Sequence, residues 1–278
     1  ETYGHSNLEN STIDAHLKGL ARLKLLTDWI ATDDRIFGDI TFNIHAKGPI
    51  SSPMLEGIIN ADNGLYEHSD VGTFYQNITI RTKAQGRRLI ITRFDAQDVT
   101  KSTDPEHGQL RGEGWIDFTE PFSPVFNVPM HLFHLRIAQN DSFISDASGT
   151  LTITGKGAEV GCKGEVTLEK ASYFIEQSAD TKIPKIIDQS LKENRQTQTK
   201  QYATAFPLEI LIHNPPGSFK VIGSGANSSW KGDFHVRKSI VNPFLVGTVY
   251  LHKGTLDILG KVLRITHGEI TFVDTDRN

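Results

Sequence analysis

The chain has 278 residues, with 22% charged and 9% aromatic side chains and a formal net charge of −4. This composition excludes wholesale disorder, and the spread of Lys and Arg argues against a nucleic-acid partner. One cysteine, Cys162, excludes an internal disulfide. No apolar run approaches the roughly 18 residues of a membrane span. The chain begins at Glu1 without a signal peptide and ends within strand-like sequence, so we expect a piece of a longer protein.

The first segment, residues 1–35, combines a strand with a helix. Apolar and polar residues alternate from Ile13 to Leu17, which predicts a strand. Leu23, Leu26 and Ile30 then follow at helical spacing. We expect one short amphipathic helix over Leu20–Asp33, covering one end of the apolar face of a sheet.

Period-two alternation dominates the rest of the chain and predicts an all-β fold. Polar residues such as Thr, Asp, His and Lys separate the apolar ones, so each strand has a wet face and an apolar face. Asn63-Gly64, Lys253-Gly254 and His267-Gly268 are interpreted as turns. The apolar positions that we expect on one interior face are Ile40, Phe42, Ile44, Leu151, Ile153, Val166, Leu168, Leu208, Ile210, Ile212, Phe234, Val236, Val249, Leu251, Leu256, Ile258, Leu263, Ile265, Ile270 and Phe272.

Two stretches share an unusual pattern, Gly38–Gly64 and Gly232–Gly254. In both, a proline (Pro53 or Pro243) lies four residues before a glycine, and a further glycine follows seven residues later. A blurred copy runs from 149 to 171. A strand, a proline-bearing turn and a second strand are therefore reused, which is typical of an elongated array.

These features divide the chain into segments. Residues 36–175 form a first set of β-repeats and residues 205–278 a second set. Residues 176–204 are polar, with too little apolar content for a buried strand, and are predicted to be a linker or surface excursion.

The apolar face of such a sheet must be covered, because a large apolar surface is unfavourable in water. The sheet could fold as a sandwich, close as a barrel or bend lengthwise into an open trough. About 16 strands at a spacing of about 4.8 Å would make a trough about 75 Å long. The repeated array favours a bent, mixed or antiparallel sheet around an apolar groove.

No chemical motif points to catalysis or to a cofactor. His131 and His134 are the closest histidine pair, but a spacing of three in a strand is expected to put their rings on opposite faces. The Ser-x-x-Lys match that begins at Ser228 lies in strand-and-turn sequence rather than at a helix start. We predict no metal, no cofactor and no enzyme activity.

Three stretches of the chain resemble a known family. The first is Leu17–Ile30, leading to Asp34-Arg35-Ile36-Phe37-Gly38. The second is Gly48–Gly57, ending in Asn63-Gly64-Leu65-Tyr66-Glu67. The third, which is the most specific, runs from Phe206-Pro207-Leu208 through Trp230-Lys231-Gly232-Asp233 to His267-Gly268-Glu269-Ile270-Thr271-Phe272. Together they resemble the C-terminal region of the TamB family of Gram-negative envelope proteins.

The resemblance implies a U-shaped sheet with an apolar interior, called a β-taco. It implies a parent protein that crosses the periplasm from an N-terminal helix in the inner membrane, and an Omp85-type outer-membrane barrel, TamA-like, as partner. The implied ligands are phospholipid acyl chains, carried between the membranes.

Two other functions remain open. The chain could be a platform for assembly of outer-membrane proteins, with sheet edges that accept a client strand by β-augmentation. It could also be a non-enzymatic secreted β-stalk, which would need polar side chains on all faces and a filled interior.

Overall fold

The computed structural model describes residues 2–7, 12–23, 35–50, 53–68, 71–99, 108–120, 123–157, 159–175, 207–238 and 243–273. Within these ranges the chain forms one fifteen-stranded sheet and contains no helix. The strands are β1 (Thr2–Asn7), β2 (Thr12–Arg22), β3 (Arg35–Pro49), β4 (Met54–His68), β5 (Thr73–Gly86), β6 (Arg88–Asp98), β7 (Gln109–Asp117), β8 (Val125–Gln139), β9 (Phe143–Lys156), β10 (Glu159–Phe174), β11 (Leu208–Gly223), β12 (Ala226–Lys238), β13 (Pro243–Ile258), β14 (Lys261–Ile265) and β15 (Glu269–Phe272).

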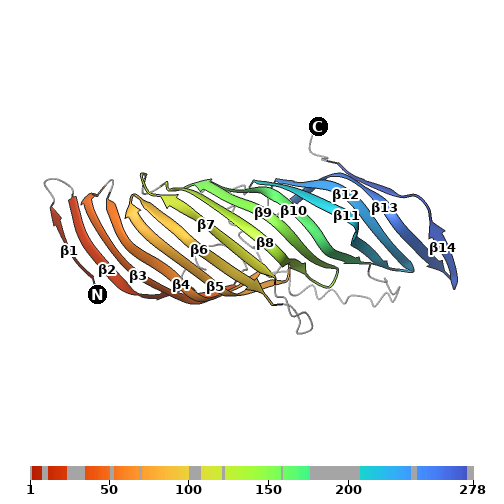
Figure 1. Cartoon of the computed structure of the whole chain (residues 1–278), viewed down its shortest axis with the longest axis horizontal. Helices are drawn as coiled ribbons and strands as arrows, with labels where there is room; N and C mark the ends of the chain where they lie inside the picture. Colours follow the sequence, from red (N-terminus) through yellow and green to blue (C-terminus); the bar gives the residue numbers. More distant parts are fainter. Residues whose placement is uncertain are drawn as a thin grey trace, which may run out of the picture.

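Successive strands are neighbours from β1 to β14 (Figure 1). β14 and β15 both pair with β13, one after the other along its length. The described pairs are antiparallel except β10 and β11, which run parallel. Because β10 and β11 run parallel, the end of β10 at Phe174 and the start of β11 at Leu208 lie at opposite rims of the sheet. The predicted linker, 176–204, lies outside the described residues.

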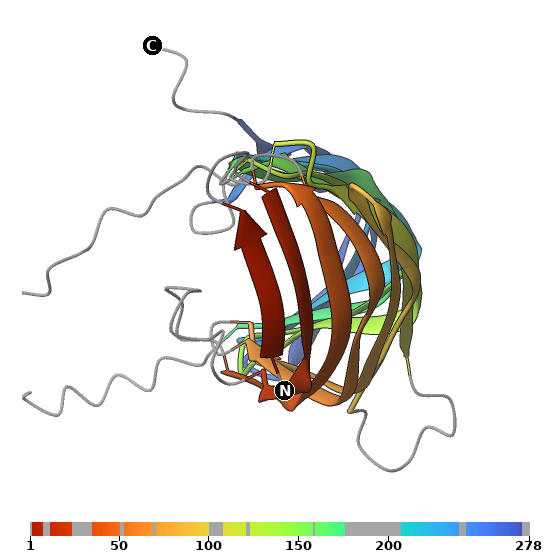
Figure 2. The same cartoon turned by 90° about the vertical axis from the view of Figure 1, so that its left-hand side faces the viewer.

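Seen end-on, the sheet is a curved wall (Figure 2). Strands β10, β11 and β13 have 16 residues each, far more than the usual five or six. A straight strand of that length would reach about 50 Å. Because this single sheet is twisted and curved, the side chains on its concave face lie closer together than they would on a flat sheet. The prediction of a long, mostly antiparallel all-β sheet is confirmed.

The first residues of the predicted helix at Leu20–Asp33 are instead part of β2. Leu20, Ala21 and Arg22 pair with Thr41, Ile40 and Asp39 of β3. Pairing with β3 gives these residues backbone hydrogen bonds that an isolated helical turn would have to replace, and it outweighs their helical spacing. Residues 24–33 lie outside the described residues.

Two predicted turns are wrong for a shared reason. Asn63-Gly64 lies inside β4 and Lys253-Gly254 inside β13. Both lie where the ladder shifts register, and Asn63 has a left-handed φ of 52°. β-bulges and turns favour the same residue types, such as Asn and Gly. In the sequence, a bulge inside a strand is therefore easily mistaken for a turn. The third turn, His267-Gly268, lies at the break between β14 and β15, as predicted.

The glycines of the repeat mark places where strands approach each other closely. Gly247 has a φ of 146°, and a Cβ there would lie 2.7 Å from the carbonyl oxygen of Asp233 on β12. Gly232, in the neighbouring strand β12, has a φ of 133°, and a Cβ there would lie 2.6 Å from the carbonyl oxygen of Thr248 on β13. Each glycine therefore permits a local backbone geometry that no other residue would adopt without strain.

Strands β6 and β7 form a short hairpin between longer neighbours. They have 11 and 9 residues, whereas β5 has 14 and β8 has 15. Beyond the end of the hairpin, the turn before β5 contacts the end of β8, where Gln139 N donates to Val71 O at 2.8 Å. We call this hairpin the β6–β7 wedge, because it separates β5 from β8 at one rim only.

A buried carboxylate closes the narrow end of the wedge. Asp98, the last residue of β6, is 1% exposed. It accepts hydrogen bonds from Gly108 N at 3.1 Å and from Arg136 N at 2.7 Å. Tyr75 donates its hydroxyl to Arg136 O at 3.0 Å, and burial raises the pKa of Tyr75 to about 12, so this hydroxyl stays a donor. Asp98 thus replaces ladder hydrogen bonds where three strands converge.

Candidate functional site

One face of the sheet carries a row of paired, mostly apolar residues across twelve strands. Directly paired residues share a face, so the register defines this row without reference to side-chain positions. From β2 to β13 it consists of Ala21, Ile40, Ala61, Ile80, Phe94, Gly112, Met130, Leu151, Gly164, Ile210, Val236 and Leu245. At about 4.8 Å per strand the row is about 50 Å long.

The register brings the predicted interior residues to this same face. Ile40, Leu151, Ile210 and Val236 are members of the row itself. The others lie in adjacent rows on the same face: Phe42, Ile44, Ile153, Val166, Leu168, Leu208, Ile212, Phe234, Val249, Leu251, Leu256, Ile258, Leu263, Ile265, Ile270 and Phe272.

Burial varies strongly over this apolar face. Leu132, Leu135, Val166 and Leu168 are 3–4% exposed and form a packed cluster with Ala147 and Ala171. The cluster lies in the halves of β8, β9 and β10 nearer the turn between β8 and β9. Leu151, Ile153 and Leu208, in the other halves of their strands, remain half-buried. At the C-terminal end of the sheet, Ile258 and Leu263 are about half exposed.

Cys162 lies on the apolar face, opposite Ile153 and Leu208. The side chain is 6% exposed, and burial raises the pKa of its thiol. A buried thiol with a raised pKa is a poor nucleophile. Cys162 therefore acts as a small packing residue of β10.

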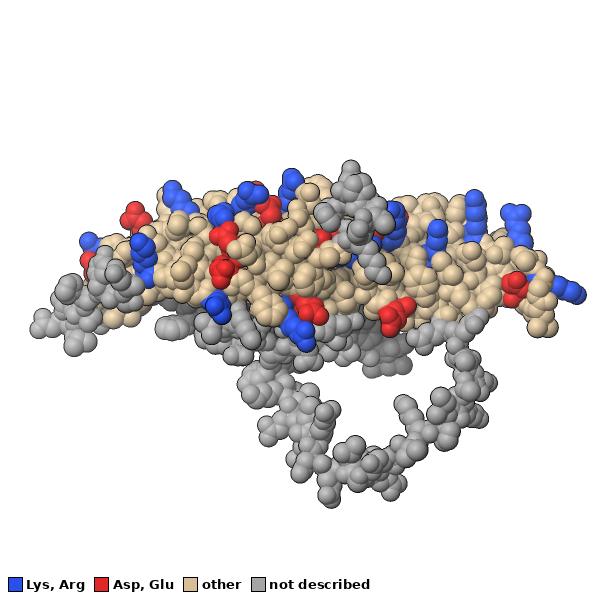
Figure 3. Space-filling model, turned by 90° about the horizontal axis from the view of Figure 1, so that it is seen from below, with Lys and Arg blue, Asp and Glu red and all other residues tan. Residues whose placement is uncertain are grey.

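The opposite face is polar and convex. In Figure 3, Lys and Arg side chains (blue) stand along the upper outline, which corresponds to the convex side of the wall in Figure 2. Many charges pair between neighbouring strands: Lys163 Nζ lies 3.0 Å from Glu209 and Arg81 Nη2 lies 2.6 Å from Asp62. The Lys163 ammonium lowers the pKa of Glu209. Exposed pairs of this kind contribute little to stability but specify register.

Two histidines on the convex face contact carboxylates of other strands. His213 contacts Glu165 at 2.5 Å and Asp233 at 3.2 Å, and the hydrogen bond to Glu165 is the main cause of its raised pKa. His134 lies in a bulge with a φ of 49°, which carries its ring to the polar face with His131, where it contacts Glu169. The expectation that His131 and His134 lie on opposite faces is therefore wrong. Among the described residues no group of side chains is arranged to hold a metal ion.

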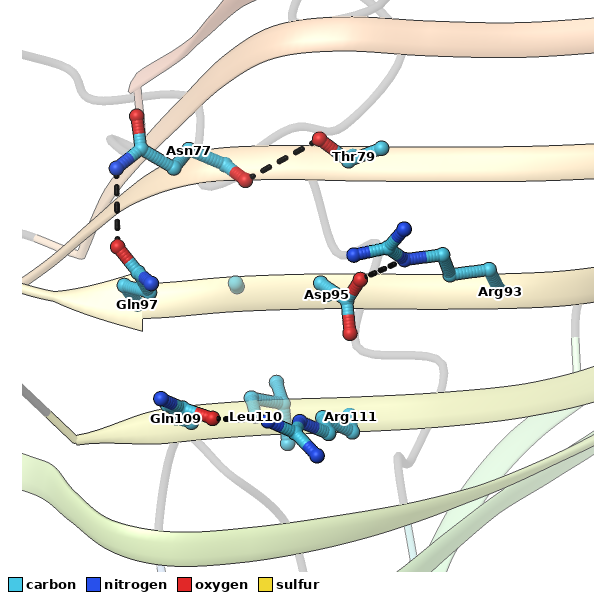
Figure 4. Close-up of a pocket in the computed structure, with 9 residues that line it drawn as sticks. Asn77, Thr79, Arg93, Asp95, Gln97, Gln109, Leu110 and Arg111 are labelled. Carbon is cyan, nitrogen blue, oxygen red and sulfur yellow. Dashed lines mark hydrogen bonds and ion pairs between the residues drawn. The ribbon is translucent and has the colours of Figure 1, made fainter.

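A polar pocket of about 590 Å³ hollows the convex face over β5, β6 and β7 (Figure 4). Sequence reasoning missed it, because its side chains are ordinary residues for the wet face of a strand. The pocket is lined by Asn77, Thr79, Arg93, Asp95, Ala96, Gln97, Gln109, Leu110 and Arg111.

The family model of the TamB C-terminal domain matches residues 97–278, well over half of the chain. The chain belongs to the TamB family. The resemblance to this family is thereby confirmed, and of the three stretches that suggested it, the third, which begins at Phe206, lies within the matched residues. Curated proteins and solved structures gave no match in the corresponding comparisons.

Membership in the TamB family associates this domain with the cell envelope, in a family of non-enzymatic transport and assembly components. Within the part of the chain that the structure describes, no helix has the length and apolar character needed to span a membrane. The match starts inside β6, so the polar pocket lies partly before it, on β5 and the first part of β6.

Proposed function

We propose that the apolar face of this TamB-family domain forms a groove that shields phospholipid acyl chains during transport between the inner and outer membranes. The U-shaped β-taco predicted from the sequence is the arrangement in which such a groove works. The proposal places the domain in the periplasm, within a parent protein anchored in the inner membrane by an N-terminal helix. An Omp85-type, TamA-like barrel is the proposed partner at the outer membrane.

The observation that supports this proposal most is the continuity of the apolar row from Ala21 to Leu245. Among the described residues no second layer packs on this face. Soluble proteins rarely leave a contiguous apolar surface of this length without a ligand or partner. Within the row, Leu151 and Ile210 pack against the cluster but remain half-buried, so part of the row stays accessible to an acyl chain.

The energetics of transfer fit a passive conduit. Burying a methylene group is worth about 0.8 kcal/mol, so a tail of roughly 14 methylenes gains on the order of 10 kcal/mol relative to water. Leaving a bilayer costs a similar amount. Movement along the groove is therefore close to neutral, and its direction has to come from an external energy source.

Photocrosslinking from the two faces tests the proposal. A photoreactive residue is placed at Ile153, Ile210 or Leu251 on the apolar face, in cells and with purified protein mixed with phospholipid vesicles. The paired controls on the polar face are Thr152, Glu209 and Tyr250. Phospholipid adducts from the apolar set alone support the conduit. Absence of lipid adducts from both sets would rule it out.

A platform for outer-membrane strand assembly is the second candidate, favoured by the edge of the sheet. β14 and β15 are only 5 and 4 residues long and are interrupted at residues 266–268. A short, broken edge strand leaves backbone groups that a client strand could pair with. Replacing Thr271 of β15 with proline should abolish binding of a client strand peptide, and undiminished binding would exclude this edge.

The third candidate, a secreted β-stalk, predicts polar side chains on all faces. The one-sided apolar pattern gives it no support.

A further inference from the structure

We propose that the polar pocket over β5, β6 and β7 binds a carbohydrate that carries a carboxylate. This inference goes beyond the lipid function, because the pocket lies on the opposite face of the sheet and its lining is polar. It also stands if the lipid proposal fails.

The pocket exists because the β5–β6 ladder is interrupted. Asn77 has a left-handed φ of 54°, and the register shifts between Gln76 and Thr79. The hydroxyl of Thr79 donates to the carbonyl oxygen of Asn77 at 3.4 Å. The regular face of a sheet offers little depth, whereas a bulge twists the strand locally and re-aims its side chains. Figure 4 shows Asn77 reaching from β5 toward Gln97 on β6.

Amide groups supply neutral hydrogen-bonding capacity. The side-chain amide of Asn77 donates to Gln97 Oε1 at 3.0 Å. Each amide has a carbonyl oxygen and two N–H groups, so this single bond leaves both a donor and an acceptor at the surface of the pocket. Hydroxyl groups donate and accept at the same atom, and a mixed lining of this kind suits them.

Arg111 supplies the charge. Its guanidinium donates to Gln109 Oε1 at 2.6 Å and lies 5.6 Å from the centre of the Phe133 ring. Asp95 stands opposite Arg111 in the ladder, but its carboxylate pairs with Arg93. Among the described residues no carboxylate forms an ion pair with Arg111. A guanidinium in this position can bind one carboxylate through two parallel hydrogen bonds.

The neighbourhood favours a sugar over a simple phosphate. A phosphate dianion carries one hydroxyl group at most and can use few of the acceptor groups in the lining, whereas a sugar carries several hydroxyls that both donate and accept. Phe133 lies opposite Gln109 in the ladder and is 46% exposed, so part of an aromatic ring is available to the C–H face of a pyranose. The polar surface from Asn77 on β5 to Phe133 on β8 extends over four strands, or about 14 Å, and this length suits an oligosaccharide.

Calorimetric titration of the full chain with trigalacturonate tests this site. We expect saturable binding that weakens at least tenfold in Arg111→Gln. The matched control, Arg237→Gln, removes the same charge from the same face on β12 and should leave binding unchanged. Gln97→Leu removes an amide but no charge and should weaken binding about fivefold. Melting temperatures of all variants are measured to check that each remains folded.

Ligand variants separate the possible sources of a signal. The methyl ester of trigalacturonate should bind at least tenfold more weakly than the acid to the wild-type chain. Inorganic phosphate at the same concentration should not displace the acid. Displacement by phosphate, insensitivity to Gln97→Leu, or equal losses in Arg111→Gln and Arg237→Gln would each overturn the proposal, as would the absence of any binding.

Discussion

Single residues hold the sheet together where its regular pairing fails, and Asp98 is the clearest case. Its buried carboxylate accepts hydrogen bonds from two backbone N–H groups, that of Gly108 just before β7 and that of Arg136 in β8. Removing a buried acceptor leaves its partners without hydrogen bonds and costs about 1–3 kcal/mol. We therefore expect Asp98→Ala to lower the free energy of unfolding by at least that amount in chemical denaturation.

Asp141→Ala is the matched control for Asp98→Ala. Asp141 is exposed in the turn between β8 and β9, and its loss should change stability by about 0.5 kcal/mol or less. Equal effects of the two substitutions would show that the hydrogen bonds of Asp98 do not stabilise the wedge.

His213 provides a pH-dependent contact at the same scale. Its pKa is raised, chiefly by Glu165 and less by Asp233. The protonated form is therefore favoured by folding, so this stabilisation is full below the unfolded pKa of about 6.5. It is lost as the pH rises through the higher pKa of the folded state. In an NMR titration, Glu165→Gln should lower the pKa of His213 more than Asp233→Asn does, and the reverse order would contradict the assignment.

Among the strands, the repeat glycines specify how neighbours pack. Gly247→Ala adds both a strained φ and a Cβ that would meet β12, so we expect a loss of about 2–4 kcal/mol. Gly217 also has a positive φ, of 90°, but a Cβ there meets nothing within 4 Å. Gly217→Ala should therefore cost only the strain, about 1–2 kcal/mol. Thermal unfolding measures the stability loss of each variant. Equal losses would mean that the close approach of β12 to Gly247 does not affect stability.

The strands themselves were predictable, because alternation of apolar and polar residues depends only on neighbours along the chain. Glu209 and Ile210 are adjacent in the sequence, and they lie on opposite faces of β11 because successive side chains of a strand alternate. The same locality explains the failures. Leu20 has helical spacing with residues that follow, yet its partner is Thr41 of β3, which no local pattern can specify.

Bulges were the second source of error. Asn63 and His134 both take left-handed backbone conformations inside strands. In sequence, the first resembles a turn and the second an ordinary strand residue. The polar pocket escaped prediction for the same reason, because it depends on the bulge at Asn77 and on side chains from three strands that only the fold brings together.

Stability should be graded over the whole molecule. Leu168 is 4% exposed within the packed cluster, whereas Leu263 is 51% exposed on the edge strand β14. Leu168→Ala should lower the free energy of unfolding by about 2–5 kcal/mol. Leu263→Ala should lower it by about 0.5 kcal/mol or less. Equal losses in urea denaturation would mean that the C-terminal end of the sheet is covered in solution.

The β6–β7 wedge has a consequence for the direction of the entire array. At one rim β5 and β8 are kept apart by two extra strands, and at the other they touch. The two rims therefore differ in length by about two strand spacings, or about 10 Å. Over a strand about 46 Å long, this difference turns the long axis by roughly 12°. The strands before the β6–β7 wedge and the strands after it are therefore stacked along different directions.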